Sequence, residues 1–186
     1  MTPSAGVDRQ ENDDVAVSEH EHCDACGFDG ATYDDAALLA ALRSLGSEWR
    51  LLLESAGPEL RVRPAPEVWS AIEYAEHTRD IVALHVYGVK EALTGNEPVL
   101  PAVDPGLADA AAVAYGDADA GVVAEEIDTQ SSRLAVLAED AGPATWSRGI
   151  TLGDVRADVR RMLEHALHDA CHHLDDVERG LVTLRA

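Results

Sequence analysis

The sequence predicts an all-α protein: an up-and-down four-helix bundle preceded by a disordered lead-in and a small loop rich in cysteine and histidine. Hydrophobic residues make up 46% of the 186 residues, whereas aromatic residues make up only 4%. Strands depend more than helices on aromatic and β-branched side chains, so this composition favours helices. Apolar residues also recur at three- and four-residue spacing in four long segments, which is typical of amphipathic helices.

The chain is long enough for one domain with a buried core and a short appendage. Residues 1–19 are polar, acidic and without periodicity, which indicates disorder. Residues 20–33 follow as a compact loop with the sequence HEHCDACGFDGATY. We therefore divide the chain into a flexible acidic N-terminal segment with a CxxC loop, residues 1–33, and a helical bundle, residues 34–186.

Capping and breaking residues place the four helices. The first begins at Asp34 or Asp35, either of which can cap it, and Gly57 and Pro58 end it. Gly180 is expected to end the last helix in a left-handed conformation. The remaining three helices are predicted at residues 68–93, 120–140 and 154–179.

The connecting segments are expected to lack strands. Residues 61–67 contain two prolines and form a connector, and residues 146–153 form a turn region. Residues 99–116 form a long loop rich in proline, glycine and alanine. Loops of that length in a compact domain are often functional covers, and we expect the same here.

The charge and the cysteine count limit the class of protein. The formal net charge is −21, which disfavours binding to nucleic acid and to anionic membrane surfaces. The N-terminus shows no secretory signal, and no apolar run reaches the roughly 18 residues of a membrane-spanning helix. Three cysteines argue against a disulfide framework. We expect a cytoplasmic protein without a nucleic-acid or membrane partner.

Histidines form the clearest candidate site. His168 and His172 are four residues apart on the predicted last helix and therefore share a face, where both could bind one metal ion. His77, on the predicted second helix between two apolar stripes, is the candidate third ligand. The alternative is that His77 is a hydrogen-bonded core residue. His85, His165 and His173 are expected at the surface or around the ligands.

A geometric conflict accompanies this site. Four apolar residues of the last helix lie roughly opposite His168 and His172: Leu163, Leu167, Leu174 and Val177. If the histidine face points into the bundle, a partner subunit or the terminal segments must cover the apolar face. This arrangement favours a homodimer.

Two segments resemble a known family. Residues 69–80 read WSAIEYAEHTRD and residues 167–176 read LHDACHHLDD. Together they resemble the DinB superfamily, and within it the actinobacterial members related to mycothiol-dependent maleylpyruvate isomerase. The resemblance implies a four-helix bundle with an open-coordinate metal whose ligands are His77, His168 and His172. It also implies a low-molecular-weight thiol, such as mycothiol, that the metal activates as a thiolate.

The leading hypothesis is therefore a metal-dependent thiol transferase or isomerase that uses a mycothiol-like thiol and an electrophilic substrate. The alternatives are a non-catalytic stress protein that binds a metal or small ligand, and a metal-dependent hydrolase. Three imidazoles accept zinc, our first choice, as well as nickel or iron. Three acids could orient the ligand imidazoles or simply be solvated charges: Glu73, Asp175 and Asp176. Three arginines are candidates for binding an anionic thiol: Arg79, Arg148 and Arg160.

A second candidate zinc site lies near the start of the chain. Cys23 and Cys26 have the C-x-x-C spacing that presents two thiolates to zinc, and His20 or His22 could add a third ligand. The alternatives are that the pair binds no metal, or that it is a redox pair, although no thioredoxin-like pattern surrounds it.

Overall fold

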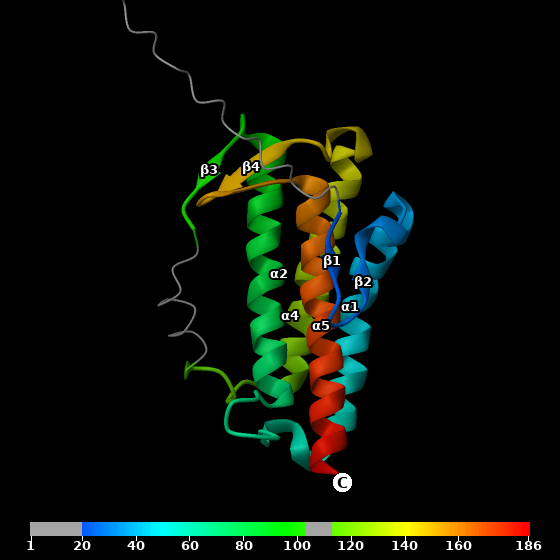
Figure 1. Cartoon of the computed structure of the whole chain (residues 1–186), viewed down its shortest axis with the longest axis vertical. Helices are drawn as coiled ribbons and strands as arrows, with labels where there is room; N and C mark the ends of the chain where they lie inside the picture. The colour runs from blue at the N-terminus through cyan, green and yellow to red at the C-terminus, as the bar shows by residue number, and fades with distance from the viewer. Residues whose placement is uncertain (1–19, 103–112) are drawn as a thin grey trace, which may run out of the picture.

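The computed structural model describes residues 20–102 and 113–186, and it confirms the predicted four-helix bundle (Figure 1). The predicted disorder of residues 1–19 and most of the predicted covering loop lie outside the described residues. The four long helices are α1 (Asp35–Ala56), α2 (Ala71–Thr94), α4 (Ala120–Ala141) and α5 (Val159–Leu184).

Each long helix begins at a polar cap, as the sequence led us to expect for the first. Asp34 accepts a hydrogen bond from the backbone N–H of Ala37, and Asp119 and Asp158 cap α4 and α5 in the same way. Ser70 begins α2 in a capping box with Glu73, whose carboxylate accepts from the Ser70 backbone N–H at 2.8 Å. These caps satisfy backbone donors that the helices leave unpaired.

The helices are arranged so that α1 and α2 lie diagonally across the bundle, each packed between α4 and α5. An ion pair between Arg43 and Glu139 joins the start of α1 to the end of α4, so these two helices are antiparallel. Arg148, just after α4, donates to the carbonyl of Ala92 near the end of α2. The helices α2 and α4 are therefore parallel, so successive helices do not all alternate in direction and the predicted up-and-down arrangement is corrected.

The core lies between the four helices and consists mainly of leucine, isoleucine, valine and alanine. Trp49 of α1 is fully buried within it. Among the described helices, none has the length and apolar character needed to cross a membrane. Besides Trp49, the large fully buried apolar side chains include Leu38, Leu42, Leu45, Ile72, Ile127, Leu134, Ile150, Leu163 and Leu167.

Short strands correct the expectation that the connectors lack them. In the loop of residues 20–33, β1 (His22–Cys23) and β2 (Phe28–Asp29) form an antiparallel hairpin, followed by a 3₁₀ turn, Gly30–Thr32. A second, three-stranded sheet is formed by β3 (Val99–Leu100), β4 (Gly149–Leu152) and β5 (Val155–Asp158). Further 3₁₀ turns are Gly57–Arg61 and Pro143–Thr145.

The last helix consequently begins at residue 159 rather than 154, and the prediction of a turn followed directly by helix was wrong. Gly153 has φ +60°, and with Asp154 it forms the two-residue connection between β4 and β5. A Gly-Asp pair between short runs containing β-branched residues is a hairpin signal. That signal was present in the sequence.

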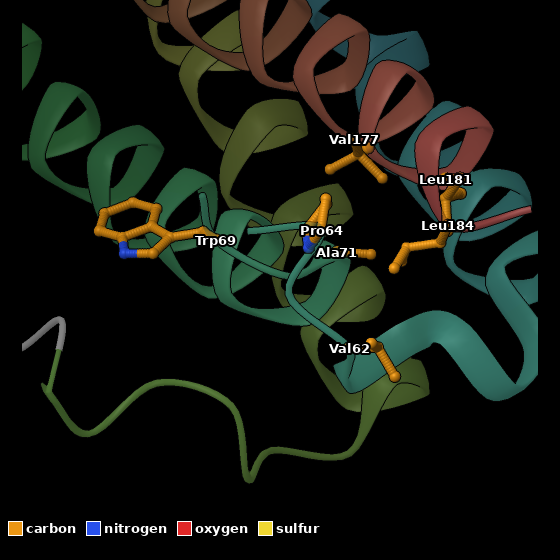
Figure 2. Close-up of a pocket in the computed structure, with 8 residues that line it drawn as sticks. Val62, Pro64, Trp69, Ala71, Val177, Leu181 and Leu184 are labelled. Carbon is orange, nitrogen blue, oxygen red and sulfur yellow. The ribbon is translucent and has the colours of Figure 1, made fainter. Parts of the chain in front are cut away.

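Gly180 does not end α5, which continues to Leu184. A Cβ atom at Gly180 would lie 2.9 Å from Cγ of Pro64, so the glycine allows the connector before α2 to pack against α5. Figure 2 shows Val177, Leu181 and Leu184 of α5 near Pro64 around a cavity of about 10 Å³. The glycine is therefore explained by packing rather than by capping.

Gly46 allows a similarly close approach between α1 and α4. A Cβ atom at Gly46 would lie 2.2 Å from Cβ and 2.4 Å from Cα of Asp128.

We predict that Gly46→Ala lowers the free energy of unfolding by about 1–3 kcal/mol, because the two backbones must separate. Urea denaturation measures this change. Gly121→Ala is the matched control at an exposed position of α4, where a Cβ atom would meet the Asp119 side chain at 3.2 Å rather than a helix backbone, so it should change stability much less. An unchanged or more stable Gly46→Ala protein would contradict the close approach.

His85 is buried, rather than at the surface or around the ligands as expected. His85 belongs to α2 and its side chain is buried. Its Nδ1–H donates a hydrogen bond to the Ile81 carbonyl at 2.8 Å. Burial lowers the pKa of His85 to about 4, because the charged imidazole would lose its hydration. The folded protein therefore holds this imidazole neutral.

This pKa predicts a loss of stability in mild acid. Between about pH 7 and about pH 5, His85 binds a proton in the unfolded chain but not in the folded chain, which costs about 2 kcal/mol of folding free energy. His85→Leu should remove that part of the pH dependence. Denaturant unfolding of the metal-free wild type and variant at both pH values measures it. An identical pH dependence in the two proteins would show that residue 85 does not carry the effect.

Candidate metal centre

The apolar face of α5 points into the bundle of its own chain. Leu163, Leu167 and Val177 are buried in the core. His168 and His172 therefore lie on the outer side of the helix, where the N-terminal hairpin covers them. No partner subunit is needed to cover the leucine face, and the homodimer stays a prediction without this support.

His77, Asp169 and His173 form a first group of candidate ligands, with one donor atom from each within 4.8 Å of the others. Asp169 Oδ2 lies 4.0 Å from His77 Nε2, and Asp169 Oδ1 lies 3.7 Å from His173 Nε2. These separations are too long for hydrogen bonds. They leave room for an ion bonded to each donor at about 2 Å.

The surroundings of this group suit a metal. Asp169 Oδ2 is buried and has no hydrogen-bond partner among the described residues, and a buried carboxylate oxygen ordinarily has one. His173 Nδ1 lies 3.0 Å from Asp176 Oδ2. With the proton on Nδ1, the lone pair of Nε2 faces Asp169, and a cation between the two acceptors would satisfy both. A carboxylate behind a ligand histidine is the usual outer partner in metal sites. The residues therefore fit a divalent ion.

Aromatic rings line this group. The ring of Trp69 lies 5.2 Å from that of His77, and the ring of Tyr74 lies 5.0 Å from that of His173. Tyr115 packs edge-on against Trp69 and donates to Asp80 at 2.9 Å. Burial and this bond to Asp80 raise the pKa of Tyr115 to about 12.

His77 itself is kept neutral. Burial lowers its pKa below the ordinary value, although the nearby charge of Asp169 acts in the opposite direction. A neutral imidazole is the form that binds metals.

Cys23, Cys26, His168 and His172 form a second group, again with donor atoms within 4.8 Å of one another. The Cys23 Sγ lies 3.8 Å from His172 Nδ1. Hydrogen bonds from the backbone N–H groups of Cys26 and Ala25 lower the pKa of the Cys23 thiol to about 6. Burial raises the pKa of the Cys26 thiol.

Glu21 organises the outer side of this second group. It accepts from His168 Nδ1 at 2.9 Å and forms an ion pair with Arg161 at 2.6 Å. Glu21 also forms a third donor group with His165 and His168. Because Arg161 already balances its charge, Glu21 acts as the acceptor that orients His168 rather than as a ligand.

A cavity of about 410 Å³ borders this network, and none of His77, Asp169 and His173 lines it. Its lining combines charged and apolar side chains from α2, α5 and the three-stranded sheet. They include His85, Leu152, Arg161, Met162 and His165, and Glu21, just before β1, also lines the cavity.

The structure divides the predicted ligand set. His77 is grouped with Asp169 and His173, whereas His168 and His172 are grouped with the two cysteines. Sequence reasoning missed Asp169 and His173 as ligands, although they have the same four-residue spacing as His168 and His172. The sequence did not show how α5 is rotated about its axis in the bundle, which decides the direction in which each of these side chains points.

The other predicted residues have separate contacts. Asp176 lies behind His173, as an orienting acid would, and Asp175 is half-buried on α5. Glu73 belongs to the capping box and pairs with Arg63, so the structure gives it a structural role. His20 hydrogen-bonds with Glu164, and His22 with Asp24, whereas the donor group around the cysteine pair contains His168 and His172.

The three arginines proposed to bind a thiol make other contacts. Arg79 pairs with Asp80 and Glu126. Arg148 donates to backbone carbonyls at the end of α2, and Arg160 pairs with acids of α1 and α5.

Comparisons with known proteins agree with this fold. YfiT from Bacillus subtilis, described as a probable metal-dependent hydrolase with an unusual four-helix bundle topology, superposes with a TM-score of 0.68 at 14% identity. The match covers 78% of this chain and 85% of YfiT. No curated protein matches the sequence. The DinB superfamily model matches residues 36–177, and the chain therefore belongs to the DinB superfamily.

Proposed function

We propose that this protein is a metal-dependent hydrolase whose divalent ion is held by His77, Asp169 and His173. The observation that carries the proposal is the buried Asp169 oxygen, which lies without a hydrogen-bond partner among the described residues, beside two imidazoles. Two histidines and one carboxylate are the donor set of several zinc hydrolases. The description of YfiT as a probable metal-dependent hydrolase supports the same class of reaction.

Three protein ligands leave a coordination position for a small molecule. A divalent ion held there would supply Lewis acidity and would lower the pKa of a bound water to about 7. The protein side chains have complementary tasks. Asp176 holds the proton on Nδ1 of His173 and so directs its Nε2 toward Asp169. Burial keeps His77 neutral, so that its nitrogen lone pair is available at neutral pH.

The lining of the centre indicates the class of substrate. Trp69 and Tyr74 supply apolar faces beside the two ligand histidines. Two acids nearby already have partners: Asp80 accepts from Tyr115 and pairs with Arg79, and Asp176 lies behind His173. The net charge of −21 on the whole chain disfavours anionic substrates. We propose an uncharged or cationic ester or amide with an apolar group beside Trp69.

Activation of a low-molecular-weight thiol, such as mycothiol, for transfer or isomerisation is the second candidate. It is favoured by the resemblance of residues 69–80 and 167–176 to thiol-dependent relatives. A metal can deprotonate a coordinated thiol as well as a water. The engagement of Arg79, Arg148 and Arg160 in ion pairs and backbone contacts leaves this candidate without its expected anion-binding residues.

We predict that Asp169→Asn and His77→Ala each lower the affinity of this centre for metal, because each removes a donor. Asp176→Asn should weaken metal affinity or activity by roughly 10- to 100-fold, since it removes the acceptor behind His173. Competition with a chromophoric chelator measures the affinities. The matched control is His22→Ala, which removes an exposed histidine of the hairpin and should leave this centre unchanged. Equal affinity in the wild type and in Asp169→Asn would end the assignment.

We predict that the metal-loaded protein hydrolyses uncharged aryl esters or anilides in the absence of thiol, and that Asp169→Asn abolishes the reaction. The release of phenol or aniline is followed by absorbance. A parallel assay contains mycothiol and an electrophile and follows the loss of thiol. Turnover that requires mycothiol would replace the hydrolase proposal with the second candidate. No turnover in either assay would contradict both and leave a binding protein.

A further inference from the structure

We propose that Cys23, Cys26, His168 and His172 bind a structural zinc ion that fastens the N-terminal hairpin to α5. This site is additional to the centre at His77 and its partners, and it shares no ligand with that centre. Two thiolates and two imidazoles form one of the common closed, tetrahedral zinc sites.

The hairpin has the backbone geometry of a zinc-binding turn. The strand β1 ends at Cys23, and β2 begins at Phe28, directly after Gly27. The backbone N–H of Gly27 donates to the Cys23 carbonyl at 2.9 Å, and Gly27 has φ +76°. A glycine adopts this left-handed conformation without strain, so the turn closes and both thiols point the same way. Backbone N–H groups directed at Cys23 stabilise a thiolate.

The two histidines complete the site from α5. Nε2 of His168 is buried and has no hydrogen-bond partner among the described residues. Glu21 holds the proton of His168 on Nδ1 at 2.9 Å, which leaves the Nε2 lone pair for a metal. His172 approaches Cys23 through its Nδ1. The spacings are C-x2-C and H-x3-H, as in known structural sites, although the two pairs are far apart in the sequence.

Charge favours a bound ion over four unbound donors. When zinc binds, the two cysteine thiols release their protons to solvent and both imidazoles stay neutral, so the ion and its four ligands carry no net charge. Two nearby acids are balanced by other cations: Glu21 by Arg161 and Glu164 by Arg160. The site therefore adds no uncompensated charge under the hairpin.

The hairpin is also held by contacts that need no metal. Glu164, fully buried on α5, accepts from the Glu21 backbone N–H at 2.8 Å and from Arg160. Arg160 in turn donates to the Tyr33 carbonyl at 2.5 Å. Removing the cysteines should therefore loosen residues 20–29 without unfolding the bundle, so that cysteine variants can be purified and measured.

The first test counts metal ions in the full chain. The wild type loaded with zinc should hold two ions, one at each candidate site, and Cys23→Ser/Cys26→Ser should hold one. His77→Ala should also hold one, and the two sets of variants together none. Cys171→Ser, which changes the remaining cysteine, is the matched control and should keep both ions. An unchanged zinc content in the folded double cysteine variant would overturn the proposal.

The second test identifies the ligands in the wild type, so it stands even if the variants fold poorly. Cobalt-substituted protein should show thiolate-to-cobalt charge-transfer absorption, which His77→Ala keeps and the double cysteine variant loses. Zinc should also protect Cys23 and Cys26 from alkylation, and a chelator should remove the protection. Absence of the charge-transfer absorption, or alkylation at the same rate with and without zinc, would overturn the site while leaving the His77 centre untouched.

Discussion

The apolar stripe of α5 fixes the rotation of that helix in the bundle, and the direction of every candidate ligand on it follows. Burial of Leu163, Leu167 and Val177 requires that stripe to face the core. Each buried leucine-sized side chain contributes about 1.5–3 kcal/mol, so the helix cannot turn without a large loss. With the stripe inward, the pair Asp169 and His173 faces α2, and the pair His168 and His172 faces the N-terminal hairpin.

Two acidic side chains of α5, Glu164 and Asp176, position the N-terminal hairpin and His173. Burial alone would raise the pKa of Glu164, but Arg160, the Glu21 backbone N–H and His20 together lower it below the ordinary value. Asp176 shows the same balance: His173 and Arg179 lower its pKa against the effect of burial. In a chain with a net charge of −21, these compensated acids position a hairpin and a ligand histidine instead of repelling their surroundings.

Much of the bundle could be predicted from the sequence because its helices follow local rules. The cap at Asp34 and the apolar spacing of α1 gave that helix nearly to the residue. His77 was recognised because it lies in a helix that is apolar on two sides. The sequence did not show which metal-binding pair on α5 faces which element. The pairs His168/His172 and Asp169/His173 overlap along the helix, and only the packing of α5 shows that one faces the hairpin and the other faces α2. The β4–β5 hairpin was missed although Gly153 and Asp154 signal it, whereas β3 could not be predicted because its partner β4 is distant in the sequence.

The two candidate ligand pairs on α5 would also limit how this helix can move. They are offset by a single residue, which corresponds to about 100° of rotation and 1.5 Å along the helix axis. With ions bound at both places, α2 and the hairpin would hold α5 at two angles around its circumference. Turning or sliding the helix to improve one set of bonds would stretch the other. Such a helix behaves as a torsionally rigid element, and conformational change in this protein would have to come from the segments around it.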